Sequence, residues 1–356
     1  MKRLPSITTA VTTAVAVAVA LVAVSACSGD EPDTITLLAY ESFPSEPDGP
    51  IALALDEFTE QTGIEVEVVI SGDTGTMLSK AALTAGNPEA DVMWGVDNTF
   101  LSRAISTGVF EPYEAVELDA IPAEFTSLVP NAEATPVDFG DVCVNYDISA
   151  LVNDDVEPPT TLADLTLPQF AGKLVVENPA TSSPGLAFLL ATIAQFGEEG
   201  WEQYWQQLRA NDVEVVSGWS DAYYSEFSGS GGDRPLVVSY GSSPPFEVIY
   251  AEPPLTEAAS GVVESSCYRQ VEFAGILSGT DAPDGARALI DFLVSERFQR
   301  EVALNLFVFP VNPAVELDQA FVDFATIPDS PITIDPILID ANRTEWIERW
   351  NAAVLR

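Results

Sequence analysis

The stretch that decides the fold is residues 64–85, IEVEVVISGDTGTMLSKAALTA. It opens with an alternation of apolar and acidic side chains, which predicts a strand over 64–70. A glycine-containing loop, 71–76, follows, and the apolar residues of 77–85 recur at the spacing of a helix. A strand, a short loop and a helix in this order form the repeating unit of a parallel α/β sheet.

The flanking segments extend this pattern. Apolar runs predict strands over 34–40 and 91–96, and helical periodicity predicts helices over 51–62 and 99–107. Ligands of such sheets gather at the carboxyl ends of the strands. Tyr40, Asp73 and Asp97 fall at such ends, although a turn or a cap explains each of them taken alone.

The amino-acid composition of the chain excludes several classes of function. The chain has 356 residues, enough for two domains, and its 55 acidic and 14 basic residues give a formal net charge of −41. Such a polyanion does not bind nucleic acid or an anionic membrane surface by charge. The chain contains no histidine, which excludes histidine-based catalysis and histidine-ligated zinc.

The N-terminus is typical of an exported protein. Lys2 and Arg3 precede a small, apolar run over 7–26, and the run ends at Cys27 in the sequence VSAC. We expect a signal peptide over 1–26 and a lipidated tether over 27–33. The VSAC segment resembles a bacterial lipoprotein box, which implies a lipid on Cys27 and a place at the outer face of the cell membrane. Ordinary secretion or an uncleaved anchor are the alternatives.

Cys143 and Cys267 are the two remaining cysteines. Outside the cytoplasm an even pair is consistent with a disulfide, and both residues lie in strand-like segments. Two buried free thiols are the alternative.

The segment 217–246, SGWSDAYYSEFSGSGGDRPLVVSYGSSPPF, has the composition of a ligand site. Aromatic faces, hydroxyls and backbone N–H groups at a strand end suit an organic cation with a polar or anionic tail. The simpler interpretation of Trp219 and Tyr240 is packing beside a turn. Ser182 and Ser183 precede a predicted helix, where they either cap it or hold an anionic group.

These motifs occur in a recognisable order: AYESF (39–43), GDTGTMLSK (72–80), ADVMWGVDN (90–98), TSSPGLAFLL (181–190), SGWSDAY (217–223), VVSYGSSP (237–244) and FVFPVNP (307–313). In this order the chain resembles the thiamine-binding solute-binding lipoproteins of ABC importers, which have the type II periplasmic-binding-protein fold. The resemblance implies two α/β lobes joined by crossing hinge strands. It places lobe 1 at 34–135 plus 268–320, lobe 2 at 136–267 and a C-terminal helical segment at 321–356.

The resemblance also implies the function and the site. It implies capture of thiamine or its phosphates and delivery to an ABC permease, by a monomer without enzymatic activity, cofactor or metal. The residues implied to bind the ligand are Tyr40, Asp73, Thr74, Ser182, Ser183, Trp219, Tyr240, Gly241, Ser242, Ser243, Pro244, Phe246 and Phe307.

Three other functions remain open at this point. Tyr223 and Tyr224 resemble the adjacent tyrosines of ferric-ion-binding proteins of the same fold, and hard oxygen ligands suit iron. The many acidic residues also permit a carboxylate-based extracytoplasmic hydrolase. A structural protein of the cell surface is the third alternative.

Overall fold

The structure is a computed structural model, and it describes residues 33–253 and 255–355. The predicted signal peptide and Cys27 lie outside the described residues. The predicted tether does too, except for Asp33, which belongs to the first strand instead. None of the helices in the described ranges combines the length and the apolar character that a membrane span requires.

The described strands form one mixed sheet of 10 strands, in the order β2-β1-β3-β9-β5-β8-β6-β7, with β10 beside β5 and β4 beside β9. The strands are β1 (Asp33–Ala39), β2 (Ile64–Ile70), β3 (Val92–Asp97), β4 (Phe110–Glu111), β5 (Thr135–Asp147), β6 (Leu174–Glu177), β7 (Glu214–Val216), β8 (Leu236–Tyr240), β9 (Ser260–Leu277) and β10 (Phe309–Pro310).

Helices join and cover these strands. They are α1 (Pro50–Thr62), α2 (Thr74–Leu83), α3 (Leu101–Ser106), α4 (Ala123–Thr126), α5 (Ile148–Asn153), α6 (Ser183–Ala210), α7 (Pro244–Tyr250), α8 (Pro283–Val294), α9 (Glu296–Leu306), α10 (Gln319–Phe324) and α11 (Pro336–Val354). Strands β1, β2 and β3 pair in parallel, as their alternation with helices predicts.

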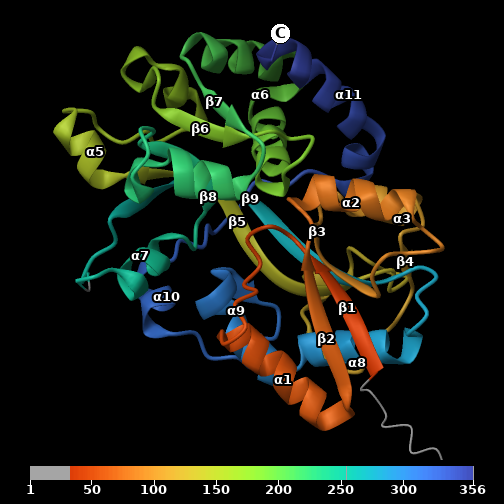
Figure 1. Cartoon of the computed structure of the whole chain (residues 1–356). Helices are drawn as coiled ribbons and strands as arrows, with labels where there is room; N and C mark the ends of the chain where they lie inside the picture. Colours follow the sequence, from red (N-terminus) through yellow and green to blue (C-terminus); the bar gives the residue numbers. More distant parts are fainter. Residues whose placement is uncertain (1–32, 254, 356) are drawn as a thin grey trace, which may run out of the picture. The chain divides into compact units, whose positions relative to one another are not determined.

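The two longest strands, β5 and β9, run antiparallel through the centre of the sheet. In Figure 1 they lie between β1, β2, α1 and α8 in the lower part of the view and β6, β7 and α6 in the upper part. Because β5 and β9 pair with each other along most of their length, they join the two ends of the sheet.

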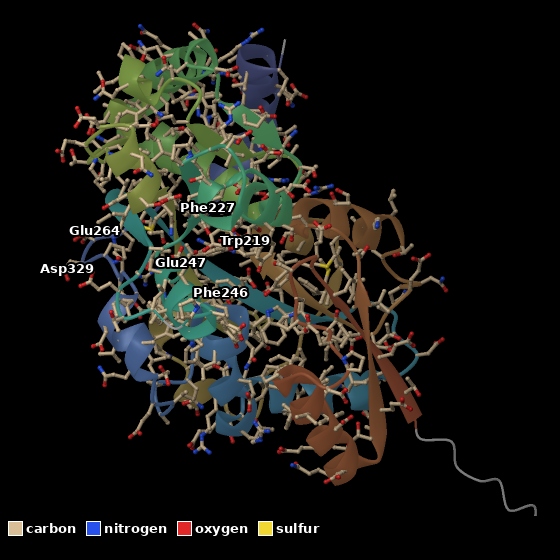
Figure 2. All side chains as sticks on the ribbon, turned by 60° about the vertical axis from the view of Figure 1, so that its left-hand side comes forward. Trp219, Phe227, Phe246, Glu247, Glu264 and Asp329 are labelled. Carbon is tan, nitrogen blue, oxygen red and sulfur yellow. A yellow bond between two sulfur atoms is a disulfide. The ribbon has the colours of Figure 1, made fainter. Side chains whose placement is uncertain are left out.

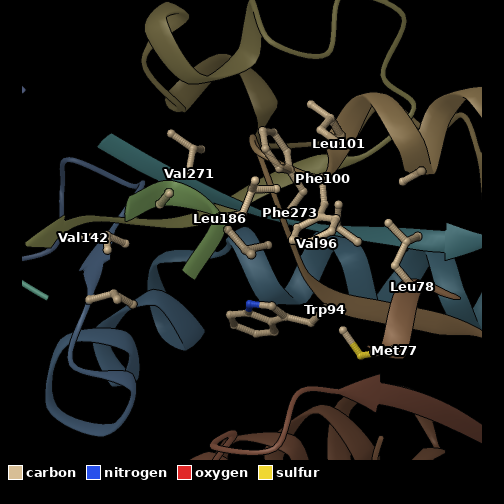
Figure 3. Close-up of a cluster of buried hydrophobic side chains, with 14 of the residues drawn as sticks. Met77, Leu78, Trp94, Val96, Phe100, Leu101, Val142, Leu186, Val271 and Phe273 are labelled. Carbon is tan, nitrogen blue, oxygen red and sulfur yellow. The ribbon is translucent and has the colours of Figure 1, made fainter. Parts of the chain in front are cut away.

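A large apolar core lies where these elements meet. Figure 3 shows part of it, with Met77 and Leu78 of α2, Trp94 of β3 and Leu186 of α6. The side chains of these residues are fully buried. Their burial holds α2, α6 and the central strands in place around the strand ends.

Cys143 of β5 and Cys267 of β9 form a disulfide, with a Cα–Cα distance of 4.2 Å. The bridge lies where the register between the two strands shifts, since Val142 pairs with Tyr268 but Val144 pairs with Val263. It therefore ties the central strands together at a point where their ladder is irregular.

Two predicted segments differ in how fully periodicity revealed them. The periodicity of 186–196 and 201–208 predicts two helices, and the structure confirms both: they lie within α6 and are separated by the non-helical backbone of Gly197, where φ is 71° and ψ is 171°. Apolar residues also predict a strand over 269–277, which is the second half of β9. The observed strand begins earlier, at Ser260, in a polar stretch without strand-like alternation.

Candidate functional site

A cavity opens at the carboxyl ends of β1, β2 and β8, as the predicted α/β pattern requires. It contains about 760 Å³ of space between protein atoms, part of it open to solvent. The residues that line it are Tyr40, Ser42, Asp73, Thr74, Ser183, Pro184, Trp219, Tyr223, Tyr224, Tyr240, Ser243, Phe246, Glu272, Asn305, Leu306, Phe307 and Val308.

One wall of the cavity is aromatic. The ring of Trp219 stacks on Tyr223 at a centroid distance of 4.9 Å and meets Tyr224 edge-on at 5.3 Å. Its indole N–H donates to Ser239 Oγ at 2.9 Å, so the orientation of the ring is held by a hydrogen bond as well as by packing. A ring held in this way offers a fixed face to a flat or cationic ligand.

Two tyrosines at strand ends add to this wall. Tyr40 follows β1, and Gly95 of β3 leaves space for it, because a Cβ at Gly95 would lie 2.4 Å from Tyr40 Cδ1. Tyr240 ends β8, and its hydroxyl donates to Gln270 Oε1 at 3.2 Å. The amide of Gln270 in turn donates to Glu272 Oε1 at 2.9 Å, which connects the aromatic wall to a carboxylate.

Asp73 is the carboxylate at the start of α2. Its Oδ1 accepts from the backbone N–H of Thr74 at 2.7 Å, and its Oδ2 accepts from the backbone N–H of Trp219 at 3.2 Å. Burial raises the pKa of Asp73, while the hydrogen bonds from Thr74, Ser182 and Trp219 act in the opposite direction. Asp73 thus connects the loop after β2 to the loop that carries Trp219, at the floor of the cavity.

The opposite rim is formed by phenylalanines. The rings of Phe246 and Phe307 meet edge-on at 4.9 Å, and Figure 2 shows Phe246 in the same region as Trp219. Phe307 ends α9 with a φ of 54°, a backbone conformation that is uncommon for a residue with a side chain. Ser242 Oγ donates to the carbonyl oxygen of Phe307 at 2.6 Å and so helps to hold it there.

The long helix α6 begins at the cavity. Ser182 is its N-cap and accepts from the N–H of Gly185, while Ser183 lines the cavity. The hydroxyl of Ser183 is buried and has no hydrogen-bond partner among the described residues. A free hydroxyl at a helix N-terminus is available to a polar group of a ligand.

The structure brings most of the predicted residues together. Nine of them line the cavity: Tyr40, Asp73, Thr74, Ser183, Trp219, Tyr240, Ser243, Phe246 and Phe307. The other four, Ser182, Gly241, Ser242 and Pro244, stand behind the lining residues. Ser182 caps α6, Ser242 holds Phe307, Gly241 is bonded to Thr326, and Pro244 is buried at the start of α7. Direct contact of these four residues with a ligand stays a prediction.

The sequence reasoning missed several lining residues, of which Glu272 matters most. It lies in the apolar segment VEFAGIL of β9, and only 7% of its surface is exposed. An acidic residue within a buried strand needs a partner or a function. The acidic residue inside an apolar run was therefore the signal by which Glu272 could have been found in the sequence. Ser42, Pro184, Asn305, Leu306 and Val308 carry no such pattern.

The charged side chains of the cavity lining are all acidic. Two carboxyl residues, Asp73 and Glu272, line the cavity, and its described lining includes no lysine or arginine. Its polar groups are otherwise hydroxyls and one amide. A site of this composition attracts a cation with flat apolar parts.

The two adjacent tyrosines lie in different environments. Burial raises the pKa of the Tyr223 phenol, and its hydroxyl donates to Glu247 Oε1 at 3.4 Å. Tyr224 is half exposed, and its ring is turned by 89° from that of Tyr223. No cluster of three or more acidic or cysteine side chains in the described part of the chain is arranged to hold a metal ion.

Known proteins resemble this chain in sequence and in structure. The sequence is 30% identical to the thiamine-binding periplasmic protein of Escherichia coli (strain K12) over 90% of this chain and 94% of that protein. The structure superposes on a solved periplasmic thiamin binding protein with a TM-score of 0.79 and 28% sequence identity, covering 91% of this chain and 96% of the other.

Iron proteins are more distant. Iron uptake protein A1 of Synechocystis sp. (strain PCC 6803) is 22% identical over 79% of this chain and 78% of its own length. The pattern of the bacterial extracellular solute-binding proteins matches residues 87–327, which is more than half of the chain. This match and the identity to the Escherichia coli protein show that the chain is a bacterial extracellular solute-binding protein, of a family whose members serve transport.

Proposed function

We propose that this protein captures thiamine outside the cytoplasm and delivers it to an ABC importer. The observation that carries the proposal is the cavity itself, in which an aromatic wall faces two carboxyl residues and no described lysine or arginine. The thiazolium ring of thiamine is a permanent cation, and the aminopyrimidine is flat and able to donate hydrogen bonds. The names of the relatives at 26–30% identity support the same ligand.

Each part of the cavity then has a role in the proposal. The faces of Trp219 and Tyr240 stack on the rings, with each cation–π contact worth roughly 0.5–2 kcal/mol. Asp73 and Glu272 provide negative charge for the thiazolium. Phe246 and Phe307 close the rim and keep water from the bound rings.

A phosphorylated form of thiamine would place its phosphate near the start of α6. The free Ser183 hydroxyl and the N-terminus of α6 are the groups that suit an anion there. Titration with thiamine and with thiamine monophosphate side by side would show which form the site prefers.

The proposal includes two lobes that close on the ligand, with β5 and β9 as the hinge. The lobes are 34–135 plus 268–320 and 136–267, followed by the helical segment 321–356. Hydrogen bonds from Trp219 N to Asp73 Oδ2 and from Gly75 N to Thr181 O, at 3.2 and 2.9 Å, join the two parts beside the cavity. Closure of this kind lets a permease distinguish loaded from empty protein.

Attachment of the protein to the outer face of the membrane through a lipid on Cys27, and its action as a monomer, also belong to the proposal. Both rest on the sequence of the leader and on the resemblance. Mass spectrometry of the protein from its native membrane would detect a lipid on Cys27 as an added mass on the N-terminal peptide.

Isothermal titration calorimetry with thiamine tests the function directly. We expect saturable binding with one site per chain, together with quenching of tryptophan fluorescence, because Trp219 lines the cavity. Ferric iron is the matched comparison, and we expect it to give no charge-transfer colour. Absence of thiamine binding would overturn the proposal, and a coloured iron complex would favour the iron-binding alternative.

A further inference from the structure

A row of three acidic residues crosses the sheet beneath the cavity. Glu272 of β9 is the register partner of Asp97 on β3 and of Asp138 on β5, the two strands that flank β9. Directly opposed residues of neighbouring strands point to the same face of a sheet, with their Cβ atoms roughly 5 Å apart. The three carboxyl groups therefore lie side by side, and the middle one lines the cavity.

The partners of these carboxyl groups are neutral. Asp138 accepts from the Trp94 indole N–H at 3.1 Å, and Glu272 accepts from the Gln270 amide. Asp97 accepts from the Thr99 hydroxyl at 2.7 Å and from the N–H of Phe100. None of the three forms an ion pair with a described lysine or arginine.

Each of the three also keeps one oxygen atom without a partner in the described structure: Asp97 Oδ2, Asp138 Oδ1 and Glu272 Oε2. Their exposed fractions are 0%, 0% and 7%. Three adjacent negative charges, none of them paired with a cation and two of them away from water, are energetically prohibitive. The row must therefore hold protons while the cavity is empty.

We propose that the row Asp97–Glu272–Asp138 is a proton-binding site that gives up a proton when a cation enters the cavity. Capture of the ligand is then an exchange, in which the O–H bond of one carboxyl group breaks, its proton passes to solvent and the ligand's positive charge takes its place. This inference rests on the proposed function, because it requires the ligand to be cationic.

Among the groups around the row, only carboxyl groups titrate in the pH range of this exchange. Burial raises the pKa to about 6 for Asp97 and to about 7 for Asp138, and it raises the pKa of Glu272 as well. Tyr40 and Tyr240 face the row from β1 and β8, and burial raises the pKa of both phenols well above 10.0, so they remain neutral.

Three further groups face the row from other elements. Asp73 lies at the start of α2, and its raised pKa makes it the other candidate for the exchange. Ser183 of α6 lies next to Asp97 and does not titrate. Arg343 of α11 acts on Asp97 from a distance, beyond the ring of Phe100, and its pKa of about 10 leaves it charged throughout.

The direction of the effect follows from linkage. A bound cation favours the ionised row, so it lowers the pKa of the row and releases a proton. Affinity for the cation therefore rises with pH through the titration of the row and becomes constant above it. A ligand that bound without proton exchange would have the same affinity at every pH in this range.

Calorimetry with thiamine in two buffers of different ionisation enthalpy measures this release. Near the pKa of about 7 of Asp138, we expect roughly half a proton per bound thiamine. Between about pH 6 and about pH 8 we expect Kd to fall at least about threefold. This range lies above the pH at which the aminopyrimidine of thiamine is protonated.

Two variants locate the exchange. Glu272→Gln keeps the shape of the side chain in the cavity, and Asp138→Asn changes the row without touching the cavity lining. In each variant we expect the proton release to fall to about a third or less of the wild-type value. Removal of one carboxyl group reduces the repulsion within the row and so lowers the pKa of the two that remain. Asp291→Asn is the control, since Asp291 binds Tyr113 and Val116 outside the cavity, and it should keep the full release.

The outcomes are distinguishable. Thiamine binding without proton release, or release that is unchanged in both row variants, would overturn the exchange and leave the proposed function intact. If thiamine fails to bind at every pH, the proposed function is wrong and the exchange is wrong with it.

Discussion

At the residue scale, the site depends on side chains that are held in place before any ligand arrives. Trp219 is fixed by stacking on Tyr223 and by its hydrogen bond to Ser239, and Tyr240 is fixed by its hydrogen bond to Gln270. A ligand that stacks on such rings loses less free energy to ordering than one that binds mobile side chains.

Removal of either ring should therefore weaken binding. We expect Trp219→Ala and Tyr240→Ala each to raise the Kd for thiamine by tenfold or more, at least about 1.4 kcal/mol, in calorimetry. Phe196→Ala is the matched control, because Phe196 is a partly buried ring stacked on Tyr204 at 4.3 Å, outside the cavity lining. Equal affinities in the two site variants and the control would show that the cavity does not bind the ligand.

The same scale shows what the sequence could reveal about the site. Most ring and carboxylate positions could be predicted, because Tyr40, Asp73 and Tyr240 follow strands that are recognisable from their apolar runs. Ser242 could not be separated from Ser243 in this way. Both serines follow the same strand. Ser243 lines the cavity and Ser242 donates to the carbonyl oxygen of Phe307, and this difference depends on where α9 ends in three dimensions.

At the element scale, local patterns predicted the helices and strands better than their pairing. The β1–α1–β2–α2–β3 segment follows from periodicity alone, since one face or both of each element is buried or, in the edge strand β2, half-buried. The meeting of β5 and β9 joins residues more than 100 positions apart, exemplified by the Cys143–Cys267 separation of 124. Contacts over such a distance leave no periodic trace in the sequence, and for this reason the carboxyl row could not be foreseen.

The C-terminal helix α11 carries two tryptophans that pack on the body of the protein. Trp346 and Trp350 lie four positions apart and share a buried face, with exposed fractions of 5% and 0%. Trp350 meets Trp205 of α6 edge-on at 5.4 Å, and Arg349 forms ion pairs with Glu198 and Glu202 of the same helix. The helix α11 is thus anchored on α6 by apolar packing and by charge.

Loss of this anchor should destabilise the protein. Trp350→Ala is expected to lower the free energy of unfolding by about 3–5 kcal/mol, because it leaves a cavity against Trp205. Leu338→Ala serves as the control on the same helix, since Leu338 is 53% exposed, and it should change stability by less than about 0.5 kcal/mol. Urea denaturation followed by circular dichroism measures both, and similar losses in the two variants would contradict this role of α11.

At the scale of the whole molecule, the buried carboxyl groups make stability depend on pH. Asp97 and Asp138 have pKa values of about 6 and about 7 in the folded protein, against about 3.9 for an unfolded aspartate. A raised pKa in the folded state contributes stability that is complete below about pH 4 and is lost as the pH rises through about 6 to 7. Hydrogen bonds lower the pKa of Asp147 and of Asp164. These two residues therefore make the protein more stable as the pH rises, but only in more acidic solution.

We therefore expect the ligand-free protein to become less stable as the pH rises from about 5 to about 8. The midpoint of thermal unfolding should fall over this range, and Asp138→Asn should reduce the fall, because it removes one of the groups that must ionise. Saturating thiamine should also reduce it, since a bound cation offsets the charge of the row. A midpoint that rises with pH in the wild-type protein would contradict this expectation.

The covalent link between the central strands has a consequence for biogenesis. Cysteines form such a bond in an oxidising compartment, whereas the cytoplasm keeps them as thiols, so production in a reducing host would yield a chain that lacks it. Cross-linking over 124 positions restricts the unfolded chain strongly, by roughly 4–5 kcal/mol in the chain-entropy treatment. Maturation would then consist of two events, passage across the membrane and thiol oxidation, and the second would supply a large part of the margin by which the finished protein resists denaturation.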